Sequence, residues 1–385
     1  PQLDIFTAPS MQLGSRASKK YSDPNAWHNQ FYSLVTTKID EEIFKPLFPE
    51  GKKSGRPNAS IRILVAMSVL KEGFGCSDED LFEKCEFDLL TRKALGMELL
   101  TDITPSIDTY YLFRRRICEY QERTGIDLMQ LCFEQLAGNQ VRLLNISGKC
   151  VRMDSKLIGS NIARQSRYEL IHTTLVKFLK TCTLSNLSPE QEERAKEYLK
   201  EDSSKTVYRS DSDTLQSNLV RIGNFIMEIL AAFPATSPAH DLLQRLFDEQ
   251  YVVMDGKAVL RDKKEVKADS LQNPNDPDAT YRAKNDQKVQ GYVTNITETV
   301  EEGKPNIITS VQVETAVFAD CHFLQEAVEN SERVTDSTIE DLYADGAYQS
   351  PDNREFAKNH NAMQLKIGKM QGGCRWELIP HDEDG

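Results

Sequence analysis

The sequence predicts an α/β protein with a helical N-terminal module, a mixed sheet and a helical insertion after the first strand. Two changes of hydrophobic period support this fold class. Up to about residue 140, apolar residues recur at helical spacing between short glycine-bearing turns. From Val141 short β-rich runs begin, and a second helical stretch from Ser160 to about Leu260 interrupts them. We therefore divide the chain into segments 1–30, 31–140, 141–160, 161–275 and 276–385.

Composition places the chain among mixed-class globular proteins. Its 385 residues are 39% hydrophobic and 28% charged, and no apolar run is long enough for a membrane span. The eight cysteines include no Cys-x-x-Cys pair, which disfavours a zinc site or a disulfide framework and favours the cytoplasm. The net charge of −12 disfavours nucleic acid as a partner, although local basic clusters can overrule this sum. Because the first residue is Pro1, we expect a processed or partial chain.

The first segment is predicted to be a polar arm, without clear periodicity up to about Asn25. Apolar residues between Phe31 and Phe48 then indicate a helix broken at Pro46 and again at Pro49. A basic loop follows, with Lys52, Lys53 and Arg56 as candidate phosphate-binding residues.

Three further helices are predicted in the N-terminal module. An apolar helix spans Ser60–Lys71, and the next spans Asp80–Lys93 with Ser77 as its N-cap. A third helix follows Thr104-Pro105 and carries three consecutive arginines, Arg114, Arg115 and Arg116. Two interpretations stay open: a small helical DNA-binding module, or a generic bundle whose arginines are solvated or paired with acids.

The second half of the chain begins with a strand that is predicted to end at Asp154, with Ser155–Ile158 either continuing it or turning away. The helical stretch after it lacks the spacing of a catalytic set and is interpreted as a structural insertion or arm. A charged connector leads to a predicted hairpin of residues 291–299 and 307–315. A helix from Phe323, a strand ending at Asp345, a helix at 351–359 and a strand at 363–367 complete the order.

Asp154 and Asp345 are the candidate catalytic residues. By itself, the run Leu342–Tyr348 is better read as a turn, with Asp345 capping a helix, Gly346 relieving the backbone and Tyr348 packing the turn. Without the insertion, however, the order of elements resembles a ribonuclease H-like sheet, in which the first and fourth strands are neighbours. Two carboxylates brought that close require a cation, and oxygen ligands favour Mg²⁺ or Mn²⁺. This pairing predicts metal-dependent phosphoryl transfer on a nucleic acid.

Several short motifs also occur in a characteristic order. They are Arg56-Pro57, the apolar helix from Ser60, Gly73-Phe74-Gly75, Ser77–Leu81, Thr109–Arg115, Arg152–Ser155, Asp276–Ala279, Lys288 with Gly291-Tyr292, and Leu342–Tyr348. Over most of Phe31 to Lys369 the chain resembles an insertion-sequence DDE transposase of the large bacterial class with an InsH-type N-terminal domain. The resemblance implies Mg²⁺-dependent cleavage and strand transfer, with Asp154 and Asp345 as metal-binding catalytic carboxylates. It also implies double-stranded DNA at transposon ends, target DNA and a homo-oligomer as partners.

The third acid of this family is a glutamate on a helix after the last core strand. Glu355 precedes that strand here, and Glu377 and Glu383 lie in an irregular tail, so we expect the third acid to be missing and the chain to be truncated. Lys288 is a further candidate for DNA contact near the active site. The alternatives are a catalytically inactive DNA-binding or oligomerising remnant and a metal-dependent nuclease of the same fold.

Overall fold

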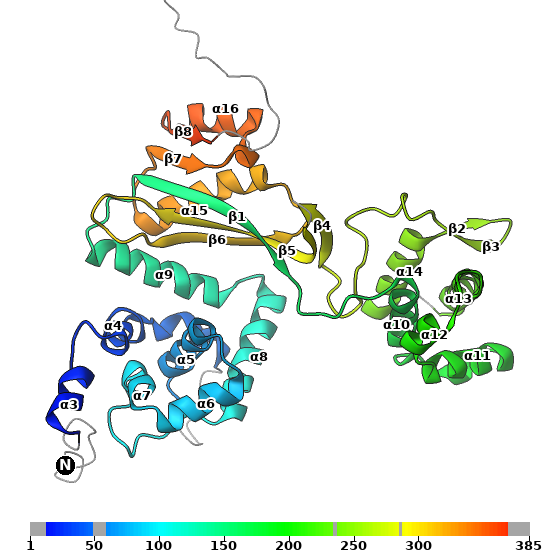
Figure 1. The fold of residues 1–385 in the computed structure, drawn as a ribbon, viewed down its shortest axis with the longest axis horizontal. Helices are drawn as coiled ribbons and strands as arrows, with labels where there is room; N and C mark the ends of the chain where they lie inside the picture. Colours follow the sequence, from blue (N-terminus) through cyan, green and yellow to red (C-terminus); the bar gives the residue numbers. More distant parts are fainter. Residues whose placement is uncertain (1–12, 49–58, 234–236, 285–286, 369–385) are drawn as a thin grey trace, which may run out of the picture.

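The structure is a computed structural model that describes residues 13–48, 59–233, 237–284 and 287–368. It is a mixed α/β fold with three parts: an N-terminal helical module, a sheet and a helical insertion (Figure 1). In Figure 1 the helical module lies below the sheet, and the insertion projects to the right. Within the described residues no helix is both long and apolar enough to cross a membrane.

Within the described residues, the helical module consists mainly of α-helices. They are α3 (Ser15–Tyr21), α4 (Trp27–Leu34), α5 (Ile61–Phe74), α6 (Asp78–Phe87), α7 (Leu89–Leu95), α8 (Ile107–Thr124) and α9 (Leu128–Leu143), with 3-10 turns at Thr36–Lys38 and Glu41–Leu47. One hydrophobic core joins them, and its largest members include Phe44, Met67, Leu81 and Tyr110. The apolar residues that recur at helical spacing in the sequence therefore form the core of the module.

Local capping signals set most of the helix boundaries in this module. Ser60 caps α5 through a bond from the Ile63 N–H, and Gly75 ends that helix in the left-handed conformation. Ser77 and Asp80 form a capping box at the start of α6. The predicted starts near Ser60 and Ser77 are confirmed.

Three expectations for this module are wrong. Residues 15–21 form a helix rather than a loose arm, and Tyr21 and His28 are buried. The Phe31–Phe48 stretch is not one helix, because α4 ends at Leu34 and two 3-10 turns follow. The predicted helix 80–93 is divided at Asp88, whose carboxylate accepts a bond from the Leu90 N–H and so caps α7.

The sheet has six strands within the described residues. They are β1 (Cys150–Gly159), β4 (Thr280–Lys284), β5 (Gln287–Thr299), β6 (Ile308–Thr315), β7 (Asp341–Ala344) and β8 (Gln364–Ile367). The long strand β5 pairs antiparallel with β4 near its start and with β6 further along. On its other side β5 pairs antiparallel with β1, after which β7 and β8 follow in parallel. The expected 291–299 and 307–315 hairpin is thus confirmed, whereas β4 was not predicted.

Strand β1 does not end at Asp154. It remains paired with β5 from Val151 opposite Thr299 to Gly159 opposite Gly291, so the alternative in which the strand continues is correct. Its pairing with β7 is much shorter and stops at Arg152 opposite Tyr343. Asp154 therefore lies where β1 has passed the end of its parallel neighbour.

One face of the sheet packs against α15 (Leu324–Thr335), which lies behind the strands in Figure 1. A core of Val151, Met153, Val293 and Leu342 from the strands meets Leu324 and Val328 from this helix. The short helix α16 (Pro351–Asn359) packs beside α15 and β8, as the sequence predicts for residues 351–359.

Helix α9 joins the helical module to the sheet. Its Glu134 pairs with Arg333 of α15 through nitrogen–oxygen distances of 2.7 and 3.2 Å. At Gly138 the two helices approach so closely that an added Cβ would lie 2.9 Å from the Val334 carbonyl oxygen. The helical module is therefore held against the same helix that covers the sheet.

The insertion is a helical unit with a hydrophobic core of its own. It contains α10 (Arg167–Leu179), α11 (Pro189–Lys200), α12 (Ser203–Arg209), α13 (Ser212–Ala232), α14 (Pro238–Gln250) and a small hairpin of β2 (Tyr251–Met254) and β3 (Lys257–Leu260). Helix α11 starts with a Ser188 cap, Pro189 at its first position and a capping-box Gln191. The β2–β3 hairpin was not predicted, because its run was assigned to the helical stretch.

Candidate active site

Asp154 lies on β1, and Asp345 follows directly after β7, the strand that pairs parallel with β1. Arg152 of β1 stands opposite Tyr343 of β7, and each aspartate lies two residues further along its own segment. Continued in the same register, Asp154 would stand opposite Asp345, although the pairing itself ends at Arg152 and Tyr343. Both residues are exposed, whereas Met153 and Leu342 point into the core beside α15. The two carboxylates thus share the solvent-facing side of the sheet.

The backbone fixes one oxygen of each carboxylate. Asp345 caps a short 3-10 helix, Gly346–Tyr348, by accepting a bond from the Ala347 N–H at 2.9 Å. Asp154 accepts a bond from the Ser155 N–H, also at 2.9 Å. The capping interpretation of Asp345 is therefore confirmed. Gly346 does not adopt a positive φ, so the expected backbone relief at this glycine is wrong.

A buried polar cluster lies on the opposite side of the strands, beneath the two aspartates. Tyr348 is fully buried, and its hydroxyl donates to Asn295 Oδ1 at 2.6 Å. Asn295 belongs to β5 and stands opposite Ser155 of β1. The expected packing of the turn by Tyr348 is confirmed, whereas Asn295 was not predicted.

The electrostatics of Tyr348 reflect how near the carboxylates are. Burial raises the pKa of its phenol, a hydrogen bond from Ser155 lowers it, and the negative charges of Asp320, Asp154 and Asp345 raise it. The charges of both candidate aspartates therefore act on a single buried hydroxyl. Asp320 is buried and pairs with Arg282 at 3.2 Å, so a cation already balances its charge.

The pair is chemically suited to a hard divalent cation. Mg²⁺ is commonly held by one or two carboxylates, with water and substrate phosphate completing its octahedral shell. Within the described residues no cluster of three or more histidine, cysteine or acidic side chains could hold a metal ion. Glu355 lies on α16, before β8, while Glu377 and Glu383 lie outside the described residues. Asp154 and Asp345 supply carboxylate oxygens, the type of ligand that such a cation takes.

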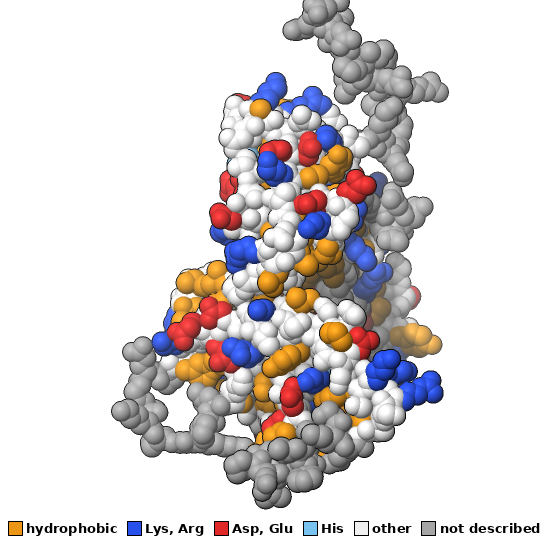
Figure 2. All heavy atoms as spheres, turned by 90° about the vertical axis from the view of Figure 1, so that its left-hand side faces the viewer, with side chains coloured by type: hydrophobic (Ala, Val, Ile, Leu, Met, Phe, Trp, Pro, Cys, Tyr) orange, Lys and Arg blue, Asp and Glu red, His pale blue; other side chains and the backbone are white. Residues whose placement is uncertain are grey.

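Basic side chains do not form one large surface on the face seen in Figure 2, where acidic and basic groups lie interspersed over the upper part of the molecule. The candidates Lys52, Lys53 and Arg56 lie outside the described residues. Lys288 lies at the start of β5, eight residues before Ile296, which faces Asp154. At about 3.3 Å per residue this is about 26 Å along the strand. The structure does not bring Lys288 close to the aspartate pair.

The three consecutive arginines point to different surroundings on α8. Arg114 lies 3.7 Å from Asp78 of α6, and Arg115 lies 3.6 Å from Glu119 on its own helix. Both arginines remain about half exposed or more. Exposed ion pairs of this length are weak, so they do not prevent contact with phosphate.

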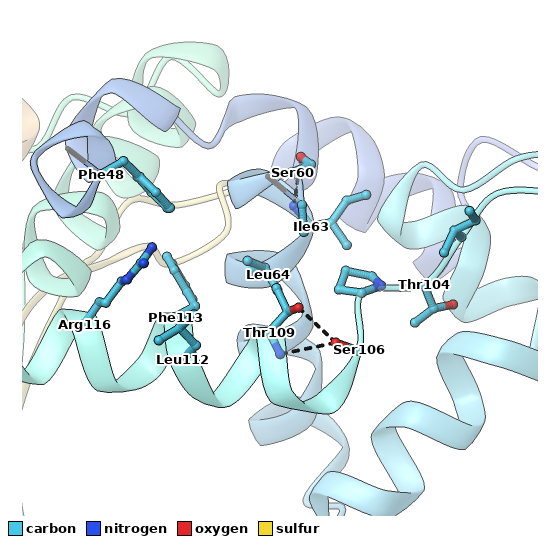
Figure 3. A pocket seen from close by; sticks show the side chains of 13 residues that line it. Phe48, Ser60, Ile63, Leu64, Thr104, Ser106, Thr109, Leu112, Phe113 and Arg116 are labelled. Carbon is cyan, nitrogen blue, oxygen red and sulfur yellow. Dashed lines mark hydrogen bonds between the residues drawn. The ribbon is translucent and has the colours of Figure 1, made fainter. Parts of the chain in front are cut away.

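Arg116 lines a pocket of about 540 Å³ between α8 and the start of α5 (Figure 3). Its guanidinium lies over the ring of Phe48, 5.3 Å from the centroid. Ser60, Ser106 and Thr109 give the pocket polar hydrogen-bonding groups, while Ile63 and Leu112 are apolar. The pocket thus combines a cation with a partly apolar wall.

Comparison with known proteins gives one match. Residues 20–116, about a quarter of the chain, match the family model described as "Transposase domain (DUF772)". No curated protein and no solved structure matches the chain. The matched range runs from the end of α3 to Arg116 on α8 and therefore covers most of the helical module. This domain match supports a transposase-family protein with a role in DNA transposition.

Proposed function

We propose that the chain is a DDE-type transposase of a bacterial insertion sequence, in which Asp154 and Asp345 bind a divalent cation at the end of the element. The carrying observation is the position of these aspartates, each two residues beyond the Arg152–Tyr343 pair of adjacent parallel strands. The transposase-domain match in the helical module gives independent support, because it comes from a different part of the chain.

The strand order also supports a ribonuclease H-like catalytic core. Strands β6, β5 and β1 are consecutive antiparallel neighbours, and β7 and β8 extend the sheet in parallel beyond β1. The insertion separates β1 from the rest of the sheet in sequence without altering this order. In a ribonuclease H-like core the first and fourth strands lie side by side. Here the corresponding strands are β1, which carries Asp154, and β7, which Asp345 follows.

The proposed chemistry depends on charge. Two carboxylates on adjacent strands repel each other, and a shared Mg²⁺ or Mn²⁺ removes this repulsion. When bound, the ion would act as a Lewis acid on a phosphodiester and would activate a water or 3′-hydroxyl. Asp154 and Asp345 each contribute an oxygen, and the backbone bonds from Ser155 and Ala347 orient their carboxyl groups.

The DDE class requires a third acid, a glutamate on a late helix. We propose that Asp154 and Asp345 alone bind metal weakly and leave strand transfer severely impaired.

The helical module is proposed to bind double-stranded DNA at transposon ends, and target DNA and a second copy of the chain are the other proposed partners. We propose the cytoplasm as the compartment, because the scattered free cysteines favour a reducing environment.

Manganese binding tests the proposed site directly. Titration of the chain with Mn²⁺, followed by electron paramagnetic resonance, should show a site that Asp154→Asn and Asp345→Asn each weaken by about tenfold or more. Asp352→Asn provides the matched control, because Asp352 is also an exposed aspartate beside a helix start, on α16. Equal affinity in all four proteins would contradict the metal site.

A DNA-binding or oligomerising remnant without catalysis is the second candidate, because the family match covers the helical module and not the sheet that carries the aspartates. Incubation with end-containing DNA and Mn²⁺ separates the two candidates. Binding without cleavage or joining supports the remnant. Cleavage or joining that Asp345→Asn abolishes supports the transposase and contradicts the need for a further acid. A metal-dependent nuclease would cleave without preference for the ends.

A further inference from the structure

Backbone pairing does not fix the separation of the two aspartates. The registered pairs between β1 and β7 end at Arg152 and Tyr343, two residues before Asp154 and Asp345. Beyond that pair, β1 continues with β5, while the other chain enters the 3-10 turn that Asp345 caps. Another contact must therefore hold the turn with Asp345 at a defined distance from Asp154.

Tyr348 makes this contact. It is the last residue of the 3-10 turn, and its hydroxyl reaches Asn295 of β5 with a 2.6 Å bond. In the sheet β1 lies between β7 and β5, and Asn295 stands opposite Ser155, the neighbour of Asp154. The phenol thus spans β1 on its buried side and connects the turn with Asp345 to the partner strand of Asp154.

Both ends of this bridge are fixed by further bonds. Asn295 Nδ2 donates to Gln312 Oε1 on β6 at 2.9 Å, which determines the orientation of the amide. At the other end, the Asn353 amide donates to the carbonyl oxygens of Tyr348 and Cys321, at 2.9 and 2.8 Å. Tyr348 and Asn295 are both fully buried. A buried network whose members are all hydrogen-bonded is rigid and costly to disrupt.

We propose that Tyr348 and Asn295 are positioning residues, whose buried hydrogen bond sets the separation and orientation of Asp154 and Asp345 and thereby the affinity of the pair for a divalent cation. This inference rests on the proposed metal site. Packing alone would need only the aromatic ring of Tyr348. The hydroxyl has a separate role, because it selects one position of the ring and so one position of the turn.

Tyr348→Phe is the direct test, because it removes the hydroxyl and retains the ring. We expect an Mn²⁺ affinity about tenfold weaker than that of the wild-type chain, as for other residues that orient metal ligands. Tyr251→Phe is the matched control. Tyr251 is 1% exposed, and its hydroxyl donates at 2.8 Å to the Leu219 carbonyl in the insertion. The control should lose a comparable hydrogen bond without a change in Mn²⁺ affinity.

A double-mutant cycle separates positioning from a general loss of stability. Asn295→Ala removes the acceptor, so the double variant Tyr348→Phe/Asn295→Ala should bind Mn²⁺ no more weakly than the weaker single variant. Additive losses, or wild-type affinity in Tyr348→Phe, would overturn the positioning role. The Asp345→Asn variant is measured alongside. If it loses Mn²⁺ while Tyr348→Phe does not, only the positioning proposal fails; if the wild-type chain binds no Mn²⁺, the proposed metal site fails as well.

Discussion

Ser160 donates a hydrogen bond to Asp276 at 2.6 Å and thereby joins the residue at which the chain leaves the sheet to the residue at which it returns. The hydroxyl of Tyr292 also donates to Asp276. At the same junction Gly291 faces Gly159, and a Cβ at Gly291 would lie 2.2 Å from the Ile158 carbonyl oxygen. The Asp276–Ala279 and Gly291-Tyr292 motifs of the sequence thus serve to hold the insertion against the sheet.

The first prediction concerns this junction. Asp276→Ala leaves two hydroxyl donors without their acceptor, so we expect the free energy of unfolding to fall by about 1–3 kcal/mol. Amide hydrogen exchange should become faster at Ser160, whose N–H bonds to the Gln290 carbonyl. Asp278→Ala, an exposed position of the same motif, is the control and should exchange as the wild type does. Unchanged exchange in Asp276→Ala would contradict this role.

The contact between α9 and α15 gives a second prediction. Gly138→Ala introduces a Cβ 2.9 Å from the Val334 carbonyl oxygen, so the two helices must move apart. We expect a lower unfolding midpoint and faster proteolysis between the helical module and the sheet. Gly73→Ala on α5 is the matched control, because no atom lies within 4 Å of its added Cβ. Equal proteolysis rates in both variants would show that close approach at Gly138 is unimportant.

Two buried thiols predict a dependence of stability on pH. Burial raises the pKa of Cys85 to about 12 and that of Cys132 to about 11, above the value in an unfolded chain. Because the folded state then binds the thiol protons more tightly, their contribution to stability is complete below about pH 8.5 and is lost as the pH rises towards 11. Denaturant unfolding at pH 8 and pH 10 measures this loss.

A Cys132→Ala variant should show a smaller loss of stability over the same pH interval. The exposed Cys118 provides the control, since Cys118→Ala should leave the pH dependence unchanged. Alkylation of the native chain at pH 8 should modify Cys118 and spare Cys85 and Cys132, as read by mass spectrometry. Rapid modification of the two buried thiols would contradict their burial.

The arginines of α8 give a fourth prediction. Replacing Arg114, Arg115 and Arg116 by alanine removes weak, exposed ion pairs with Asp78 and Glu119 and the contact of Arg116 with the Phe48 ring, so the fold should be retained with a small loss of stability. If these arginines bind phosphates, DNA affinity should fall and its salt dependence should become shallower by up to about three in the log–log slope. Fluorescence anisotropy across a salt series measures both quantities. Unchanged retention on DNA or heparin would exclude this assignment.

Much of the fold followed from local patterns in the sequence. The apolar helix after Ser60, the 291–315 hairpin and helix 351–359 each carry their own period and capping signals. Features that depend on partners distant in sequence were missed. Strand β4, for example, forms because β5 is long enough to pair with it as well as with β6.

In the candidate site, too, local sequence patterns were predicted correctly and contacts between residues distant in sequence were missed. Asp154 and Asp345 could be identified because each follows a short apolar run and their strands fit a familiar order. The bond between Tyr348 and Asn295 could not, because it joins residues 53 apart through a geometry that only the assembled sheet creates. The break at Asp88 was missed because an aspartate inside an apolar helical pattern reads equally well as a surface residue or as a cap.

The three hydrophobic cores have a consequence for the way this chain unfolds. The insertion, the helical module and the sheet each bury a separate cluster of side chains, and the helical module and the sheet are joined by contacts such as Glu134–Arg333. Cooperativity within each cluster should exceed cooperativity between them. Heating should therefore produce more than one calorimetric transition, and a substitution in the insertion should shift one of these transitions while the others keep their temperature.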